Sequence, residues 1–335
     1  MKPTVIIAEA GVNHNGDIRL AKKLINIAVK AGADFIKFQA FKADLLTTEE
    51  VEKAEYQKKT SGSSKTQHEM LKDLELTFED FELLKEFSQK KKIGFMVSAF
   101  DLESLAFINT LNPEYIKVPS GEITNIPYLR AVGMLRRKVI LSTGMSTLKE
   151  IKIAVDCLLE SGIKKNNLII LHCNTEYPTP IEDVNLKAMI SIADEFSCRV
   201  GYSDHTNINE VSISAVALGA TVIEKHITID RNLEGPDHLA SMEPEDFKNF
   251  VDSIRKTEVL LGSKIKKPSA SERKNLQHAR KVIVAGKSIK KGEVLSSINL
   301  TLKRAGNGLS PIIWDSVIGQ IAIKDFNKNQ IIKLK

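Results

Sequence analysis

Two short stretches decide the fold of this chain: GYSDH at residues 201–205 and IEKH at residues 223–226. Each stretch follows an apolar run and ends in charged groups and an imidazole, the pattern of a buried strand whose end lies at a site. About twenty residues with one helical pattern separate the two ends, so the strands should lie side by side in a parallel sheet. We therefore expect His205 and His226 to meet at one edge of that sheet.

The same alternation of apolar strand and amphipathic helix runs through most of the chain. Eight β–α units in about 260 residues indicate an α/β protein with a (β/α)8 barrel, the TIM barrel, and not a doubly wound sheet. A dinucleotide-binding fold is excluded, because Gly11 and Gly16 do not have the Gly-x-Gly-x-x-Gly spacing after the first strand. The predicted strands cover residues 5–11, 35–41, 94–100, 115–120, 138–144, 167–173, 198–205 and 221–229.

The organisation changes after the last predicted barrel helix, residues 247–261. Residues 264–272 are rich in Lys, Pro and Ser, which is typical of a linker, and the short strand and turn signals beyond them lack barrel periodicity. We expect a catalytic barrel at 1–262, a linker at 263–278 and a small domain at 279–335. A domain of about 55 residues is marginal alone, so it should dock on its own barrel or on a partner subunit.

Composition and charge narrow the class of protein. The apolar share of 42% and the charged share of 27% are ordinary for a soluble protein. No apolar run approaches the ~18 residues of a membrane span, the first residues lack a signal-peptide layout, and the three scattered cysteines suit a reducing compartment. We therefore expect a cytoplasmic protein without a membrane partner. The net charge of +6 does not indicate nucleic acid, because lysines alternate with acids and aromatics are only 6%.

Polar side chains at the predicted C-terminal strand ends form the candidate site, because barrel chemistry lies at that mouth. Lys37 and Lys117 interrupt apolar strands, and a buried ammonium needs a carboxylate or phosphate partner. A structural ion pair inside the barrel explains either lysine alone. Together with Ser120 and Ser142 they also suit a cradle for a phosphate and a carboxylate, as in phosphoenolpyruvate. A Schiff-base lysine is the competing use of the same residue.

His205 and His226 are candidate ligands of a divalent metal. Two neutral imidazoles with nearby carboxylates can hold such an ion and leave positions open for substrate. One histidine near a strand end more often satisfies a neighbour, but two in matching places favour a metal.

Two segments outside the regular barrel also carry candidates. Residues 42–70 form a long polar loop after the second strand, where barrels keep lids and substrate contacts. In the small domain, Arg304 precedes Gly306 and Gly308, which would make a flexible loop that presents one guanidinium. A solvated turn explains the same residues.

A series of motifs follows in order along the chain: EAGVNHNG at 9–16, KFQ at 37–39, KVPSGE at 117–122, STGM at 142–145, HCNTEYPTP at 172–180, GYSDHT at 201–206 and GPDH at 235–238. Together they resemble the bacterial sialic acid synthase family, which includes N-acetylneuraminate, legionaminate and pseudaminate synthases. IKKGE at 289–293 and Lys303-Arg304 resemble that family's antifreeze-like SAF domain, a β-clip. The resemblance covers nearly the whole chain.

The resemblance implies a transferase that condenses phosphoenolpyruvate and the open-chain aldehyde of N-acetylmannosamine with water. The products are phosphate and a nine-carbon 2-keto sugar acid for cell-surface polysaccharide. The alternative is a legionaminate or pseudaminate synthase acting on a 6-deoxy diacetamido hexose, and the NTEYPTP motif favours N-acetylmannosamine. Two other classes are a Schiff-base aldolase and a non-enzymatic binder, but a binder leaves the polar groups at eight strand ends unexplained.

The resemblance also implies roles for individual residues. A metal held by His205 and His226, Mn²⁺ first with Mg²⁺ or Co²⁺ as alternatives, would bind the aldehyde oxygen. Glu9 is the first candidate for proton transfer and Glu224 the second. Arg304 would reach the active site of the other subunit of a domain-swapped homodimer and bind the N-acetyl end of the sugar. Phosphoenolpyruvate would be bound by Lys37, Lys117, Ser120, Ser142, Ser203 and Thr175 or its neighbour Asn174, and the sugar by Gln39, Tyr177 and Asp237.

Overall fold

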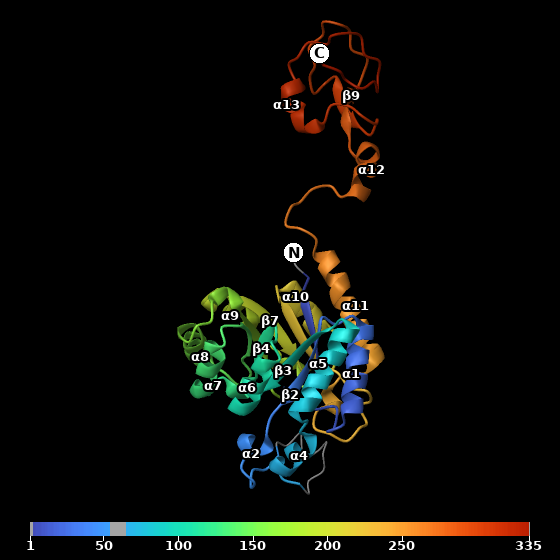
Figure 1. Cartoon of the computed structure of the whole chain (residues 1–335). Helices are drawn as coiled ribbons and strands as arrows, with labels where there is room; N and C mark the ends of the chain where they lie inside the picture. The colour runs from blue at the N-terminus through green and yellow to red at the C-terminus, as the bar shows by residue number, and fades with distance from the viewer. Residues whose placement is uncertain (1–2, 54–64, 335) are drawn as a thin grey trace. The chain divides into compact units, whose positions relative to one another are not determined.

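The structure is a computed structural model that describes residues 3–53 and 65–334. It divides into two compact units, Met1–Gly262 and Ser263–Lys335. In the first unit eight parallel strands close in chain order into a barrel, which confirms the predicted fold (Figure 1). The strands are β1 (Val5–Gly11), β2 (Phe35–Ala40), β3 (Gly94–Ala99), β4 (Tyr115–Val118), β5 (Lys138–Ser142), β6 (Leu168–Cys173), β7 (Arg199–Asp204) and β8 (Val222–His226).

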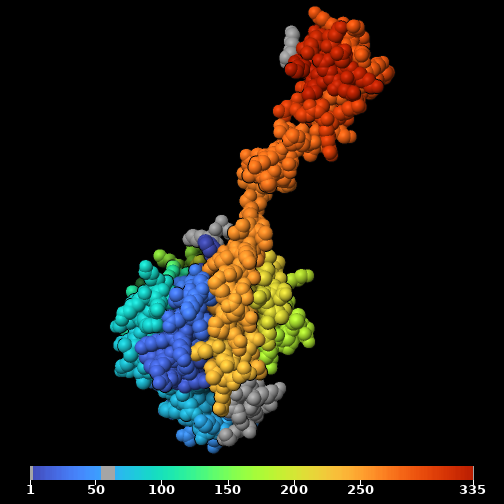
Figure 2. All heavy atoms as spheres, turned by 90° about the vertical axis from the view of Figure 1, so that its right-hand side faces the viewer, coloured from blue at the N-terminus to red at the C-terminus, as the bar shows by residue number. Residues whose placement is uncertain are grey.

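Amphipathic helices surround the barrel. In α1 the buried residues recur every three to four positions, the side chain of Asp17 caps the first turn, and Gly32 ends the helix at φ 85°. Figure 2 shows α11 lying between α1 and α10, with which it packs. The helices of this layer are α1 (Ile18–Ala31), α5 (Phe78–Lys91), α6 (Leu102–Thr110), α7 (Ile126–Met134), α8 (Leu148–Glu160), α9 (Lys187–Phe196), α10 (Glu210–Ala217) and α11 (Pro244–Leu261).

The inner face of the barrel is built in layers. Side chains alternate along a strand, so a residue two positions after an inward apolar one also points inward and lies nearer the C-terminal mouth. Glu9 follows Ile7 in this way, and Glu224 follows Val222. The fold therefore places charged groups directly above an apolar plug. That plug consists of Ile7, Met96, Tyr115, Ile140, Ile169, Leu171 and Val222, with Val5 and Phe35 packed against it.

The segment after β2 contains two short helices, α2 (Ala43–Leu46) and α4 (Gln67–Leu74), which lie at one end of the barrel (Figure 1). A capping box between Thr66 and Glu69 starts α4. The predicted long polar loop over 42–70 thus contains two helices in its described part, while residues 54–64 lie outside the described residues. Apolar side chains at helical spacing form these helices, but the many polar residues around them obscure that spacing in the sequence.

The second unit has its own small core around Ile283, Ile289 and Phe326. Its β9 (Val282–Ala285) and β10 (Leu300–Lys303) pair antiparallel, and α13 (Trp314–Val317) packs beside them. The predicted linker is not entirely irregular, because α12 (Ala270–Ala279) begins at a capping box of Ser269 and Glu272.

None of the helices in the described residues combines the length and the apolar composition that a membrane span needs. Short 3₁₀ turns occur at Ser120–Glu122, Lys165–Asn167, Ile181–Asp183, His238–Ala240 and Pro311–Ile313.

Candidate functional site

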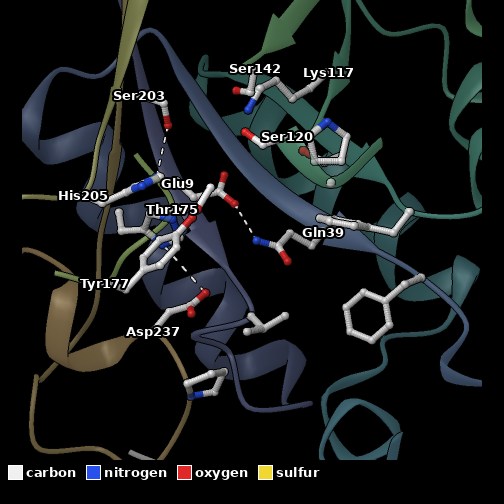
Figure 3. Close-up of a pocket in the computed structure, with 18 of the residues that line it drawn as sticks. Glu9, Gln39, Lys117, Ser120, Ser142, Thr175, Tyr177, Ser203, His205 and Asp237 are labelled. Atoms are coloured by element: carbon white, nitrogen blue, oxygen red, sulfur yellow. Dashed lines mark hydrogen bonds and ion pairs between the residues drawn. The ribbon is translucent and has the colours of Figure 1, made fainter. Parts of the chain in front are cut away.

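A pocket of about 450 Å³ opens at the C-terminal ends of the barrel strands. In Figure 3, Ser203, His205 and Tyr177 lie on one side of it, and Lys117, Ser120 and Ser142 lie on the other. Of the predicted site residues in the first unit, Asn174 does not line it. Arg304 belongs to the second unit, where it is exposed after β10. The predicted residues that line it are Glu9, Lys37, Gln39, Lys117, Ser120, Ser142, Thr175, Tyr177, Ser203, His205, Glu224, His226 and Asp237.

Two lysines and two glutamates form a buried charged layer at the base of the pocket. Lys37 Nζ lies 2.6 Å from Glu9 Oε2 and 3.5 Å from Glu224 Oε2. Lys117 Nζ donates to both Glu224 oxygens, at 2.9 and 3.1 Å. Each lysine is therefore paired with a carboxylate, as the ion-pair interpretation expects, and each also lines the pocket, so the cradle for phosphate and carboxylate stays a prediction.

Within this layer the pKa values of the two carboxyl groups shift in opposite directions. Burial raises the pKa of Glu9, and the Lys37 ammonium opposes that rise only in part. Burial acts on Glu224 in the same direction, but Lys117 and Lys37 outweigh it, so the pKa of Glu224 is lowered. Glu224 is the fixed anion of the layer, and Glu9 is the carboxyl that exchanges a proton more readily.

The structure brings the two histidines together at the rim. The ring centroids of His205 and His226 are 5.4 Å apart, and Tyr177 stacks on His205 at 4.1 Å. Tyr177 also meets His226 edge-on at 5.6 Å. One tyrosine therefore fixes the orientation of both imidazoles.

Hydrogen bonds leave lone pairs on these imidazoles. His205 Nδ1 donates to the carbonyl oxygen of Asn174, so Nε2 keeps its lone pair. Ser203 Oγ lies 3.2 Å from that Nε2, but its single hydroxyl proton goes to Glu224 at 3.0 Å. His226 Nδ1 is buried and has no hydrogen-bond partner within residues 3–53 and 65–334.

This donor set fits a divalent cation with two imidazole ligands. Burial lowers the pKa of both groups, to about 4 for His205, so both are neutral at physiological pH, as metal ligation requires. In the described part of the chain no group of three or more His, Cys, Asp and Glu side chains could hold a metal. Water or substrate oxygens would therefore supply the remaining ligands.

The opposite side of the pocket presents hydroxyl groups. Ser120 Oγ accepts a hydrogen bond from Gly144 N at 3.0 Å. A Cβ at Gly144 would lie 2.9 Å from that oxygen and 2.5 Å from the Thr175 side chain, so glycine makes room for both. Thr175 lines the pocket, whereas Asn174 Oδ1 accepts a hydrogen bond from Glu176 N at 2.7 Å. Asn174 therefore supports the site through its own loop and through His205.

Asp237 closes the rim beside His226, with its Oδ2 3.9 Å from Nδ1. Burial, with a smaller effect of Glu9, raises the pKa of Asp237 to about 7. At neutral pH this carboxyl is partly protonated and can donate a hydrogen bond to a bound ligand. Its loop is fastened by Ser241, whose Oγ donates to Asp237 O at 2.6 Å and accepts from Asn13 at 2.8 Å.

The sequence interpretation missed an apolar side of the pocket. Its residues come from the loops after β1, β2 and β3 and from α2 and α4. The spacing of Met70, Leu71 and Leu74 is helical, and with the Thr66–Glu69 capping box it could have indicated α4. We call this side the apolar wall, defined by Val12, Phe41, Leu46, Met70, Leu71, Leu74 and Phe100.

Comparison with known proteins places this site in a family. The NeuB family matches residues 24–266, and the SAF domain matches residues 280–335. The chain belongs to the NeuB family. The expected resemblance, fold and SAF domain are thereby confirmed, and so is the class of enzyme, a phosphoenolpyruvate-dependent nonulosonate synthase.

Several NeuB relatives match the chain over most of its length. It is 50% identical to N,N'-diacetyllegionaminic acid synthase of Campylobacter jejuni over 333 residues, covering 99% of this chain and all of the relative. It is 48% identical to the protein of that name from Legionella pneumophila, covering 94% of this chain and 89% of the relative. The sialic acid synthetase of Leptospira borgpetersenii, solved in complex with citrate, has 36% identity and a TM-score of 0.72, covering 82% of this chain and 91% of that one. The legionaminate alternative thus fits these relatives better than the expected N-acetylmannosamine substrate.

Proposed function

We propose that this NeuB member is an N,N'-diacetyllegionaminate synthase, which condenses phosphoenolpyruvate with an open-chain 6-deoxy diacetamido hexose. The observation that carries the choice of sugar is the near full-length identity of 50% and 48% to two relatives of that name. The NTEYPTP motif does not argue against it. Its Tyr177 packs on the histidines, in a part of the site that the reaction needs with any sugar.

The reaction joins C3 of the enol to the aldehyde carbon of the sugar. Positive charge develops at C2, water adds there, and the C2–O bond to phosphate breaks. A 2-keto acid and inorganic phosphate result, and one proton reaches the former aldehyde oxygen. The chain must therefore bind an anionic donor, hold an aldehyde beside it and move protons.

The charged layer supports binding of the donor. Lys37 and Lys117 line the pocket, Ser120 and Ser142 offer hydroxyl groups on the same side as Lys117, and Thr175 adds a third hydroxyl group. Charge-assisted hydrogen bonds of this kind are the strong ones for phosphate and carboxylate. Glu224 pairs with both lysines and fixes their positions before the donor arrives.

The histidine pair supports a metal at the aldehyde. We assign His205 and His226 as its protein ligands, with Mn²⁺ as the first candidate, and when bound the ion would act as a Lewis acid toward the aldehyde oxygen. Glu9, whose pKa is raised by burial, is the group we assign to proton transfer. Gln39 donates to Glu9 Oε1 at 3.1 Å and holds that carboxyl in place.

A comparison of two sugars tests the proposal. The purified full chain is incubated with phosphoenolpyruvate, Mn²⁺ and either the 6-deoxy diacetamido hexose or N-acetylmannosamine, and phosphate release and product mass are followed. We expect kcat/KM for the diacetamido sugar to exceed that for N-acetylmannosamine by at least tenfold. A preference for N-acetylmannosamine would make the chain a sialic acid synthase instead. Trapping of a pyruvate adduct by borohydride would indicate a Schiff-base aldolase.

A further inference from the structure

The pocket has two chemically different halves. Lysines, serines and histidines from β2 to β5, from β7 and β8, and from the residues just after these strands line one half, whereas the apolar wall lines the other. Four residues of the wall are nearly buried: Val12, Phe41, Met70 and Leu74. Leu46 and Leu71 are half-buried and face the pocket. Because one half of the pocket is charged and the other is apolar, a molecule that fits it should itself be polar at one end and apolar at the other.

Polar contacts between α2 and α4 hold this wall in place. Asp44 on α2 accepts from Lys72 Nζ at 3.1 Å and lies 2.9 Å from His68 Nε2, and both partners belong to α4. Glu75 Oε1 accepts from the backbone N of Ala43 at 2.7 Å. On the inner side Phe41 meets Phe100 edge-on, with centroids 6.4 Å apart. The apolar wall is therefore preformed, which lowers the ordering cost of binding.

The chemistry of the reaction orients the sugar. The aldehyde carbon must approach the donor and the histidines in the polar half, so the far carbons of an extended open-chain sugar point away from that half. A 6-deoxy diacetamido hexose carries a methyl group at C6 and an acetamido methyl group at C4. N-acetylmannosamine carries hydroxyl groups at both positions. Beside the apolar wall these two hydroxyl groups would lose their hydrogen bonds to water, and the apolar side chains of the wall would offer none in return.

We propose that the apolar wall is the subsite for the C6 methyl and the C4 acetamido methyl of the acceptor sugar. This assignment rests on the proposed function and extends it to named residues. Thr47 and Gln67 also line the pocket beside the wall and offer a hydroxyl and an amide to the C4 acetamido group. One extra methyl group in an apolar pocket is worth about 10- to 200-fold in discrimination. Two such groups suffice for the choice between the sugars.

Leu71→Asn tests the subsite, because it places an amide of similar size in the wall. We expect kcat/KM for the diacetamido sugar to fall by about 10- to 100-fold, with KM for phosphoenolpyruvate changed less than about threefold. For N-acetylmannosamine kcat/KM should fall less than threefold or rise. Leu71→Met, which keeps the wall apolar, should stay within about threefold of wild type. Leu46→Asn is the second variant, and it keeps the test decisive if Leu71→Asn does not fold.

Leu45→Asn is the matched control. Leu45 lies on α2 beside Leu46, but it is 56% exposed and does not line the pocket. Its kinetics with both sugars should equal those of the wild type. An equal loss for both sugars in Leu71→Asn and Leu46→Asn, or no loss for either, would refute the subsite. The wild-type preference reports on the proposed function separately, because it is measured without any change to the wall.

Discussion

At the scale of single residues, the site depends on imidazoles that are kept neutral by burial. His205 is fixed by one backbone carbonyl and one tyrosine, and His226 presents a nitrogen without a hydrogen-bond partner in the described part of the chain. Neutral, oriented imidazoles are what a borderline divalent cation binds well. The two residues are therefore best tested through metal binding as well as turnover.

We predict that His205→Ala and His226→Ala each weaken Mn²⁺ binding at least tenfold and abolish synthase activity, while the circular dichroism spectrum is unchanged. Titration calorimetry with Mn²⁺ alone gives the first readout. His278→Ala is the matched control, since His278 lies on the exposed face of α12. Wild-type Mn²⁺ affinity in both site variants would refute the metal assignment.

His14 makes the stability of the barrel depend on pH. Burial lowers the pKa of His14 to about 4, and its Nε2 has no hydrogen-bond partner among the described residues. Between pH 6.5 and 4 the unfolded chain binds a proton on this group that the folded chain does not, so stability falls as the pH falls through this window. The loss from this group is roughly 3 kcal/mol in total and is complete below about pH 4.

The prediction is that His14→Gln has a shallower loss of stability than the wild type over that window. Thermal or urea unfolding of both proteins at a series of pH values measures the difference. The same loss in both proteins between pH 6.5 and 4 would show that His14 does not carry the effect.

At the scale of elements, β7 and β8 are joined behind the site by a buried ion pair. Lys225 Nζ lies 3.0 Å from Asp204 Oδ1, and both side chains are fully buried. Asp204 also accepts hydrogen bonds from Thr206 N at 2.9 Å and Ser212 Oγ at 2.6 Å. Lys225 directly precedes His226, and Asp204 directly precedes His205. The ion pair therefore fixes the strand ends that carry the histidines.

Asp204→Asn should lower the free energy of unfolding of the barrel by about 3–5 kcal/mol, because it leaves the Lys225 ammonium buried without its partner charge. The double variant Asp204→Asn with Lys225→Met should regain much of that loss. Unfolding in urea measures both. Asp204→Asn with wild-type stability would mean that water or a shifted partner replaces the lost carboxylate.

The strands and the charged groups at their ends could be predicted because side chains alternate between the two faces of a strand. Two positions after an apolar residue on the same strand stand Glu9, Lys37, Lys117 and Glu224. The pairing within that layer could not, since it depends on the register of the closed barrel, in which Glu9 lies opposite both Lys37 and His226. The choice between neighbours in a loop, such as Asn174 and Thr175, depends on local turns that the sequence pattern does not determine.

The elements that sequence patterns described poorly are short. Helix α2 has four residues, too few for a periodic signal, and α4 has eight, so its spacing of apolar residues is informative only together with its capping box. Their packing against Val12 and Phe100, from distant parts of the chain, decides their structure. The proposed sugar subsite thus lies in the part of the fold that local sequence determines least.

At the scale of the whole molecule, the barrel and the SAF domain are separate compact units. Arg304 is exposed on the surface of the second unit. A domain-swapped homodimer, in which Arg304 completes the site of the partner, remains our proposal for the role of this unit.

Mixing two inactive variants tests the swap. Arg304→Ala and Lys117→Ala impair different units, so hybrid dimers of a swapped enzyme contain one intact site. We expect activity to recover to about a quarter of the wild-type value after random subunit exchange, and Lys117→Ala mixed with Ser142→Ala, in the same unit, is the control that should not recover. Proven exchange without recovery would show that Arg304 does not act across subunits.

The most direct test of the whole account follows the bridging oxygen of phosphoenolpyruvate labelled with ¹⁸O. Turnover with the 6-deoxy diacetamido hexose should release phosphate that carries the label, because water adds at C2 and the C–O bond breaks. Lys117→Ala should release little labelled phosphate under the same conditions. Release of unlabelled phosphate, or formation of the sugar acid without phosphate, would contradict the reaction assigned to the barrel mouth.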